Sequence, residues 1–403
     1  MIKSIHIKNF KTIVDLNLEL GQFNVLIGEN GCGKSNILEA IAIGAASNAD
    51  KLDYEFLGNR GLRVTEPNFM FSAFENGKKK KSIDVDFLDD INNTYPVNLS
   101  LDASSLFNWI NTNKEVAYKE IDKILKDIST GNKNVLANSS NSEKEIKWIS
   151  TISDILQEIS KDNSSVNILT SSIFKSVIEK LFNNTYIADF IIYNPEQSYL
   201  RDFRASNQKL PFSIKGEGLF QELKKISKDK KRVNQIKEIK ELLGVLDWFE
   251  DFEIPGDLLS NEYTLKVKDR FLNPKLEYFD QRSTNEGFLF LLFYFTLFVS
   301  KDTPRFFAID NIEASFNPKL CTRVIQKLAY LSRKKKKQVI VTTHNPSVLD
   351  GLTLKDNDQR LFVISRNMEG HTKARRIEYK SERSISLSEA WKKGLIGGLP
   401  DNF

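Results

Sequence analysis

The chain opens with an alternation of hydrophobic and polar residues that predicts β-structure. The alternation covers residues 2–8 and 14–20 and is typical of strands with one buried face. The mostly apolar run at residues 23–27 predicts a short strand that is buried on both faces. From Lys34 onward the apolar residues fall at helical spacing. The first 50 residues are therefore predicted to form three strands, a loop and a helix.

Strands and helices also alternate in the C-terminal part of the sequence. We expect strands at residues 263–268, 305–309, 338–342, 361–366 and 374–379, and helices at residues 288–299 and 320–331. Such alternation predicts an α/β fold whose sheet is largely parallel and is flanked by helices. Weaker strand patterns at residues 83–87 and 97–101 extend the N-terminal region.

The middle of the chain has a different composition, which suggests an insertion. Residues 104–182 are rich in Asn, Ser, Lys and Ile, and their apolar residues recur at helical spacing. We therefore expect four regions: an N-terminal lobe at 1–103, an inserted helical subdomain at 104–185, a strand with a basic helical segment at 186–262, and a C-terminal lobe at 263–403. The C-terminal residues 394–403 fit either a docking tail or a loosely ordered end.

Composition excludes several classes of protein. With 40% hydrophobic and 28% charged residues, the chain is a folded protein and neither disordered nor collagen-like. Its two cysteines lie far apart in sequence, so a disulfide framework is not expected and the cytoplasm is the expected compartment. No secretory signal precedes the first strand, and the apolar run at 288–299 is shorter than the roughly 18 residues of a membrane span. No membrane partner is expected.

A phosphate-binding motif lies between the third strand and the first helix. The segment GENGCGKS at residues 28–35 fits the pattern G-x-x-x-x-G-K-[ST]. In this motif backbone amides surround the phosphates, the lysine reaches the terminal phosphates, and the hydroxyl binds magnesium. We therefore expect ATP with Mg²⁺ as cofactors, Ser35 as a metal ligand, and a P-loop fold. The predicted nucleotide-binding residues are Gly28, Asn30, Gly31, Cys32, Gly33, Lys34, Ser35 and Asn36.

Two further polar residues follow apolar strands. Asp310 ends the strand predicted at 305–309, as expected for an aspartate that binds magnesium beside a phosphate loop. His344 follows the strand predicted at 338–342, where its imidazole would approach a γ-phosphate. Because strand ends of a parallel sheet meet at one edge, these residues are expected near Lys34.

Together these segments resemble the ABC-type ATPases, in particular the soluble branch that contains the SMC, RecF and OLD families. The likeness rests on the opening IKSIHIKNFKTI, the loop GENGCGKS, Asp310, the segment ASFNP at 314–318 and the segment VTTHNP around His344. Residues 193–201 and 215–219 look like segments of OLD-like ATPases of bacterial anti-phage defence operons. The resemblance implies an ABC-type ATPase head with a mixed sheet.

The resemblance also implies a dimer in which each chain completes the partner's nucleotide site. Ser283, Thr284 and Asn285 occupy the place of the family's signature sequence, which binds the γ-phosphate in trans. Ser283 and Glu286 equally satisfy the capping box S-x-x-E, a purely structural alternative. Gln197 is a candidate for the family's Q-loop, with a surface glutamine as the alternative. A homodimer or a higher oligomer through the ATPase heads is expected.

One position departs from the family pattern. Asn311 stands where rapidly hydrolysing relatives have a glutamate that polarises the attacking water. An amide can orient water but cannot accept its proton, and loss of such a base costs about 10²- to 10⁴-fold in rate. Glu313 is a candidate substitute if the backbone stays extended. We expect slow hydrolysis, with Asn311, Glu313 and His344 as the residues nearest the reaction.

Three functions fit these features. The first is a sensor subunit of an anti-phage defence complex that controls a separate nuclease or toxin, because the sequence has no TOPRIM-like carboxylate cluster or His-Asn-His pattern. The second is a RecF-like DNA-repair ATPase, and the third is a non-hydrolysing scaffold that binds nucleotide. The basic residues between Lys224 and Arg232 are either phosphate contacts or a solvated helix face. Nucleic acid is thus a candidate partner.

Overall fold

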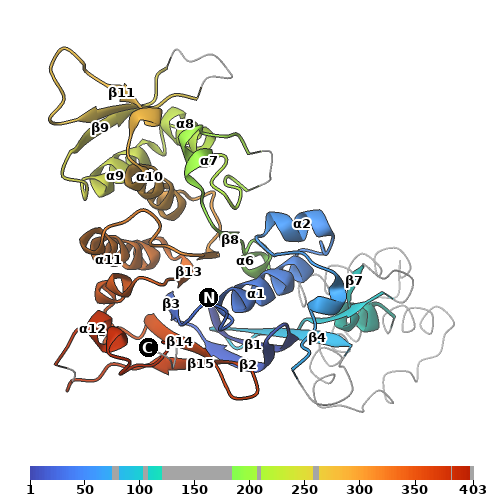
Figure 1. The fold of residues 1–403 in the computed structure, drawn as a ribbon. Helices are drawn as coiled ribbons and strands as arrows, with labels where there is room; N and C mark the ends of the chain where they lie inside the picture. Colours follow the sequence, from blue (N-terminus) through green and yellow to red (C-terminus); the bar gives the residue numbers. More distant parts are fainter. Residues whose placement is uncertain are drawn as a thin grey trace, which may run out of the picture.

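The computed structural model describes residues 1–74, 81–102, 108–119, 184–206, 210–256, 263–382 and 384–399. A body of two sheets carries a separate lobe built mainly of helices, which stands above the body in Figure 1. Most of the insertion predicted at residues 104–185 lies outside the described residues. Within the described ranges no helix combines the length and the apolar character that a membrane crossing requires.

The central sheet has the strand order β15-β14-β3-β13-β12-β8. Its strands are β3 (Phe23–Ile27), β8 (Ile192–Tyr193), β12 (Phe306–Ile309), β13 (Gln338–Thr342), β14 (Gln359–Arg366) and β15 (Thr372–Ile377). All neighbouring strands pair in parallel except β15, which is antiparallel to β14. The parallel strands are buried on both faces, and their side chains alternate between two hydrophobic cores.

The second sheet is antiparallel and belongs to the N-terminal region. Its order is β2-β1-β4-β6-β7, with β5 paired to β4. Its strands are β1 (Ile2–Phe10), β2 (Ile13–Glu19), β4 (Ser82–Asp89), β5 (Thr94–Tyr95), β6 (Asn98–Leu101) and β7 (Trp109–Asn111). Helix α1 (Lys34–Asn48) shares one core with both sheets and is buried at 13 of its 15 positions. A Cβ atom on Gly44 would lie 2.9 Å from the Phe87 ring, so glycine lets helix and sheet approach closely.

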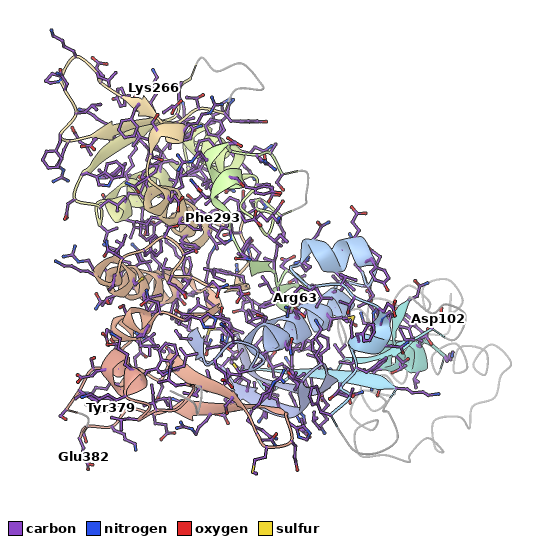
Figure 2. All side chains as sticks on the ribbon, in the orientation of Figure 1. Arg63, Asp102, Lys266, Phe293, Tyr379 and Glu382 are labelled. Atoms are coloured by element: carbon purple, nitrogen blue, oxygen red, sulfur yellow. The ribbon has the colours of Figure 1, made fainter. Side chains whose placement is uncertain are left out.

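The second core joins the central sheet to the upper lobe. This distal lobe contains α7 (Gln197–Arg201), α8 (Leu219–Lys228), α9 (Val233–Leu243), α10 (Glu286–Val299) and the sheet β11-β10-β9. The strands of that sheet are β9 (Phe249–Glu253), β10 (Lys266–Asp269) and β11 (Phe279–Asp280). The α10 side chain Phe293, labelled in Figure 2, packs edge-on against Tyr193 of the central sheet.

The remaining helices and turns complete the described structure. They are α2 (Tyr54–Asn59), α6 (Thr185–Ala188), α11 (Pro318–Lys335), α12 (Leu387–Lys392) and the 3₁₀ turns η1 (Pro67–Phe69), η3 (Gln281–Ser283) and η4 (Pro346–Gly351). Helix α11 covers the central sheet on the side of the distal lobe, and η4 packs against both α11 and α12.

The structure differs from the sequence prediction in the distal lobe. The basic helical segment expected within residues 186–262 forms two helices, because the Asp229 carboxylate accepts a hydrogen bond from the Lys231 N–H and Asp229 itself is extended. Strands β9 and β10 pair across the boundary expected between residues 262 and 263, so the segments on either side share one sheet. In the region expected at 186–262, the strand that precedes the helices is the short β8, which follows α6.

Candidate nucleotide-binding site

Three parallel strands bring the predicted residues to one edge of the central sheet. Strand β13 lies between β3 and β12, with Val341 paired to Val25 on one side and to Ile309 on the other. The phosphate loop at residues 28–35 follows β3, Asp310 follows β12, and His344 lies just beyond β13. Because these strands run in the same direction, the three polar segments meet at their carboxyl ends.

The phosphate loop has backbone angles that favour glycine. Gly28, Gly31 and Gly33 have φ angles of 151°, 77° and 110°. A Cβ atom on Gly33 would lie 2.2 Å from Thr372 Oγ1, and one on Gly28 would lie 2.2 Å from the backbone oxygen of Ile364. The glycines at 28 and 33 are therefore required both by conformation and by close packing against β14 and β15.

Lys34 lies across this loop. Its ammonium group donates hydrogen bonds of 2.9 Å to the backbone oxygens of Gly28 and Glu29, and the residue is only 6% exposed. Burial lowers the pKa of Lys34, while the nearby Cys32 and Asp310 oppose this effect. The fold thus places the Lys34 ammonium close to the Asp310 carboxylate, as a shared magnesium nucleotide requires.

Two residues predicted to bind nucleotide instead face the protein. Cys32 is 1% exposed and burial raises the pKa of its thiol, so a reactive thiolate is not favoured there. The Asn36 amide donates a hydrogen bond of 2.7 Å to Thr12 Oγ1. Their side chains therefore support the loop, and Cys32 offers a ligand only its backbone.

Two threonines that sequence reasoning missed hold the loop in place. Thr372 Oγ1 lies 3.0 Å from the Cys32 backbone oxygen, to which it donates, and 2.6 Å from Thr12 Oγ1. The Thr372 N–H also donates to the Thr12 backbone oxygen. The two threonines are 360 residues apart in sequence, and no local pattern marks either of them.

The residues predicted to bind magnesium share one cavity. Ser35 and Asp310 both line a space of about 270 Å³ beside the loop, together with Glu39, Arg63 and Asn194. Arg63, labelled in Figure 2, pairs with Glu39 of α1. A hydroxyl and a carboxylate are oxygen ligands of the kind that Mg²⁺ takes together with nucleotide phosphates. The donor set therefore fits magnesium.

The structure brings Asn194, and not Gln197, to this cavity. Asn194 directly follows β8, the neighbour of the strand that ends at Asp310. Gln197 is the first residue of α7 and is absent from the cavity lining. The signal for Asn194 was present in the sequence, because a polar residue at the end of a parallel strand is directed to the same edge as Asp310.

Position 311 and position 313 have different surroundings. Asn311 is exposed and adopts a left-handed conformation with φ of 54°, so the backbone does not stay extended after Asp310. Glu313 Oε1 nevertheless accepts a 2.7 Å hydrogen bond from the His344 backbone N–H. Its Oε2 is buried and has no hydrogen-bond partner among the described residues. The carboxylate nearest His344 is thus that of Glu313.

His344 lies close to the charged groups of the loop. Burial and the positive charge of Lys34 lower the pKa of His344, while Glu313 and Asp310 act in the opposite direction. The side chain borders a second cavity of about 410 Å³ that also touches Gly28, Glu29 and Asn30. His344 is therefore placed next to the ammonium group that would contact terminal phosphates.

The signature segment lies in the distal lobe. The Asn285 side chain caps α10 by accepting from the Phe288 N–H at 2.9 Å, and the Asp280 carboxylate accepts from Ser283. The alternative of a capping box starting at Ser283 is therefore wrong, because the helix begins at Glu286. Thr284 is buried and donates to the Gln281 backbone oxygen, whereas Ser283 is exposed.

A cavity of about 520 Å³ adjoins this segment, and its lining includes Asn285, Ser315 and Lys319. The Ser315 hydroxyl donates to Glu286 at 2.7 Å and so connects the start of α10 to the segment at 314–318. The cavities beside the phosphate loop contain none of Ser283, Thr284 or Asn285 in their linings. The two groups of predicted residues therefore remain separate within one chain.

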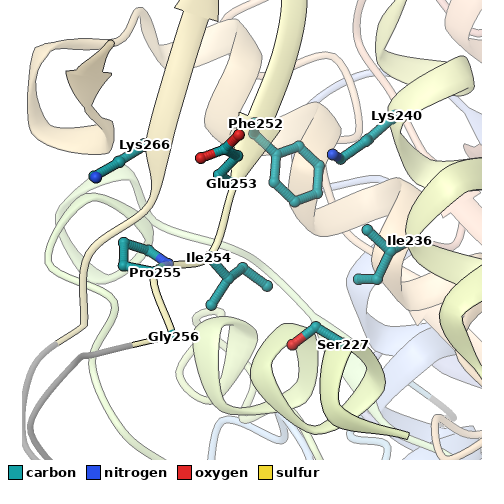
Figure 3. Close-up of a pocket in the computed structure, with 9 residues that line it drawn as sticks. All are labelled: Ser227, Ile236, Lys240, Phe252, Glu253, Ile254, Pro255, Gly256 and Lys266. Atoms are coloured by element: carbon teal, nitrogen blue, oxygen red, sulfur yellow. The ribbon is translucent and has the colours of Figure 1, made fainter. Parts of the chain in front are cut away.

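Another cavity of about 400 Å³ lies at the far end of the distal lobe (Figure 3). Figure 3 shows Lys240 from α9 and Lys266 from β10 on opposite sides of Glu253 and Ile254. The lining of this cavity contains none of the residues predicted to bind nucleotide. Several of the residues predicted to bind nucleotide instead line the cavities at the phosphate loop.

Many of the basic residues form internal ion pairs. Lys225 and Arg232 both pair with Asp302, and Lys334 and Lys335 both pair with Glu238. Within the described part of the chain, no ion pair includes Lys228, Lys230 or Lys231, while Lys337 is buried. Lys228 at the end of α8 and Lys230 and Lys231 in the turn before α9 thus remain as candidate phosphate contacts. Lys224 of α8 is likewise in no ion pair with a described residue and lies over the Phe220 ring.

Comparison with solved structures supports the fold. An SMC head bound to the C-terminal winged-helix domain of ScpA aligns with a TM-score of 0.52 at 15% identity, covering 97% of this chain and 99% of that chain. The SMC head of Thermotoga maritima aligns with a TM-score of 0.46 at 13% identity, covering 94% of this chain and 99% of that one. At such identities the likeness concerns the fold alone.

Sequence comparison identifies the family. MJECL10, an uncharacterized protein of Methanocaldococcus jannaschii, is 57% identical over 44 residues, which are 11% of this chain and 20% of that protein. The chain thus matches about a fifth of the length of that relative. The model of the family described as "AAA domain, putative AbiEii toxin, Type IV TA system" matches residues 23–350. The chain therefore belongs to this family and has a P-loop NTPase fold of the ABC-type, SMC-like head class.

Proposed function

We propose that this chain is a slowly hydrolysing ATPase that dimerises with ATP and serves as the regulatory sensor of a bacterial anti-phage defence complex with a separate effector. One observation carries the proposal. Ser35 and Asp310 line one cavity beside the loop that Lys34 spans, and they would suit a magnesium nucleotide there. The position after Asp310 holds an exposed asparagine in place of a general base. Such a site favours a long-lived ATP-bound state.

The binding step depends on the loop and on two metal ligands. Backbone amides of residues 28–35 and the Lys34 ammonium would hold the phosphates, and Ser35 and Asp310 would hold Mg²⁺. When bound, Mg²⁺ neutralises phosphate charge. Thr342 Oγ1 donates to Asp310 and also accepts from the Asn311 N–H at 2.9 Å, so the carboxylate is held in one orientation.

Hydrolysis is expected to be slow because of the residues after Asp310. The Asn311 amide can orient water without accepting its proton. The Glu313 carboxylate is the nearest acid to His344, but one of its oxygens is engaged by the His344 N–H. We assign to Glu313 the role of a weak substitute base and to His344 a contact with the γ-phosphate.

Dimerisation would complete the site. Ser283 and Asn285 are exposed in the distal lobe, so a second chain could present them to the nucleotide held by Lys34. The SMC head with a TM-score of 0.52 was solved with ScpA bound, which supports the idea that a head of this fold also carries a partner protein. The turn with Lys228, Lys230 and Lys231 is the proposed contact for nucleic acid.

The family supports the proposal of a separate effector. Its description refers to a type IV toxin–antitoxin system, which by its name has more than one component. Together with the resemblance to OLD-like defence ATPases, this supports an effector that is a nuclease or a toxin encoded nearby. Coexpression with the product of the neighbouring gene, followed by phage challenge, tests the role. Protection that requires both genes and Lys34 supports it, and protection unchanged by Lys34→Ala contradicts it.

Asn311 also favours a second function, a scaffold whose nucleotide only fixes the quaternary structure. Phosphate release and molecular mass, each measured with and without ATP, separate the two functions. The sensor predicts turnover above that of Lys34→Ala and an ATP-dependent dimer. Turnover equal to that of Lys34→Ala, with ATP-dependent assembly intact in the wild type, supports the scaffold. A wild-type chain that does not bind ATP excludes both functions.

A further inference from the structure

The C-terminal segment, defined here as residues 386–399, is docked beside the phosphate loop. It lies outside residues 23–350, which match the family model. The Asp350 carboxylate accepts hydrogen bonds of 3.0 Å and 2.6 Å from Ser388, and the Ile396 backbone oxygen accepts 2.6 Å from Arg375. Trp391 and Ile396 are part of the core shared with the central sheet. The segment is therefore held at both its helix and its tail.

The tail of this segment contacts the loop itself. Gly398 has a φ angle of 82°, and a Cβ atom there would lie 3.4 Å from the Gly28 Cα and 2.8 Å from Val363. A side chain at 398 would thus push the tail away from the loop. The 410 Å³ cavity next to His344 is lined on one side by Gly28, Glu29 and Asn30 and on the other by Trp391, Lys392, Gly398 and Leu399.

One residue in the lining of this cavity carries a buried hydrogen-bond donor without an acceptor. Trp391 is 3% exposed, and its Nε1 has no partner among the described residues. The same atom would lie 3.6 Å from a Cβ on Gly398, so it faces the contact between the tail and the loop. Buried donors are rarely left unpaired, because an unmade hydrogen bond is costly.

The position of the cavity indicates which part of a nucleotide it would meet. In this motif the lysine reaches the terminal phosphates. The Lys34 ammonium donates to the backbone oxygens of Gly28 and Glu29. Both of these residues line the cavity together with His344. The cavity is therefore next to the terminal phosphate. Lys392 is exposed in the lining and adds a positive charge there.

We propose that the C-terminal segment completes the nucleotide site and that Trp391 and Lys392 contact the terminal phosphate of a bound nucleoside triphosphate. The proposal rests on the nucleotide binding assigned above. Trp391 Nε1 would donate to a phosphate oxygen after a small shift of residues 397–399, and Lys392 would add a charge-assisted hydrogen bond. These contacts would distinguish ATP from ADP, since ADP lacks the group that they meet.

The test compares the affinities of the full-length chain for ATP and for ADP, each with Mg²⁺. Lys392→Met and Trp391→Phe are each expected to weaken ATP binding about tenfold and to leave ADP binding nearly unchanged, as for the loss of one hydrogen bond to a charged group. Trp391→Phe keeps an aromatic ring in the core, and Lys392 is exposed, so both variants should fold.

Matched controls are available in the same chain. Lys393→Met removes a neighbouring lysine that pairs with Glu389 and is absent from the cavity lining. Trp109→Phe makes the same change at a buried tryptophan of β7 that is also absent from that lining. Neither control should alter the ratio of ATP to ADP affinity. An unchanged ratio in both Lys392→Met and Trp391→Phe overturns the proposal while ATP binding stands. Loss of all nucleotide binding in the wild type overturns the proposed function itself.

Discussion

The phosphate-loop region and the signature region differ in how completely a single chain assembles them. In the first, segments from residues 12 to 372 are joined by hydrogen bonds around a buried lysine. In the second, Ser283 and Asn285 remain exposed on the distal lobe, and Asn285 serves to cap α10. Folding of a single chain therefore assembles the phosphate-loop region, whereas it fixes only the local structure of the signature region.

Among the changes in the phosphate-loop region, loss of Lys34 is expected to have the largest effect on ATP binding. Lys34→Ala removes the ammonium group that spans the loop, and ATP affinity should fall about 100-fold or more. Isothermal titration with MgATP measures the change. Lys373→Ala, which removes an exposed lysine beside Thr372, is the control and should bind normally. Similar affinities of the two variants would mean that the loop is not the nucleotide site.

Asp310→Asn tests the metal position next. An amide oxygen can still accept the hydrogen bond from Thr342, so the fold should be retained. The lost charge should reduce magnesium-dependent turnover about 100-fold. A magnesium titration of phosphate release measures this effect. If the variant shows the same magnesium dependence as the wild type, Asp310 does not bind the metal.

Asn311→Glu tests whether a missing base limits the rate. Glutamate at a left-handed residue with φ of 54° costs about 1 kcal/mol, yet the new carboxylate should raise turnover several-fold. Asn311→Gln brings the same strain without the charge and is the control. Equal turnover in the two variants would show that the base is not limiting. Glu313→Gln should lower turnover if Glu313 is the substitute base.

Two substitutions in the signature region separate its structural role from its proposed role in the dimer. Their expected effects are smaller than those at the phosphate loop. Asn285→Ala removes the cap of α10 and should lower the free energy of unfolding by about 1 kcal/mol. Ser283→Ala leaves that cap in place and should weaken only the ATP-dependent dimer. Urea unfolding and mass measurement with ATP distinguish the two. An unaffected dimer in Ser283→Ala would argue against a role in trans.

The smallest predicted effect concerns the titration of His344. Because burial and the Lys34 charge lower its pKa, His344 should titrate below 6.5, and its imidazole should be neutral at pH 7. Lys34→Ala removes the positive neighbour, so the midpoint should move upward. NMR of the imidazole Cε1–H signal against pH measures both midpoints. A midpoint that does not respond to Lys34→Ala would separate His344 from the loop.

The sequence predicted the elements whose pattern is local. Strands β3 and β13 were predicted with the bounds that the structure has, because five largely apolar residues flanked by polar ones leave few alternatives. Strand β9 was missed because its sequence FEDFE has three acidic residues, and only its pairing with β10 makes it a strand. The pattern of residues within one segment does not indicate which distant strand that segment pairs with.

Local pattern also predicted part of the candidate site, but not the residues that depend on distant contacts. Lys34, Ser35 and Asp310 follow from motif and strand order, and the structure places them around one loop. Thr372 was not predicted, because it supports the loop through a contact with a residue hundreds of positions away. Trp391 was not predicted either, because only the fold brings it to the same cavity as the loop. Asn194 stood at a strand end but was passed over for Gln197, because β8 has only two residues and its boundary is hard to locate.

The bond between Thr12 and Thr372 has a consequence for biosynthesis. The loop emerges from the ribosome early, but the hydroxyl that supports it is made about 340 residues later. At about 5 to 20 residues per second this delay lasts tens of seconds. A chain cut short before residue 372 would present the motif without its support, so a truncated product would compete poorly for ATP.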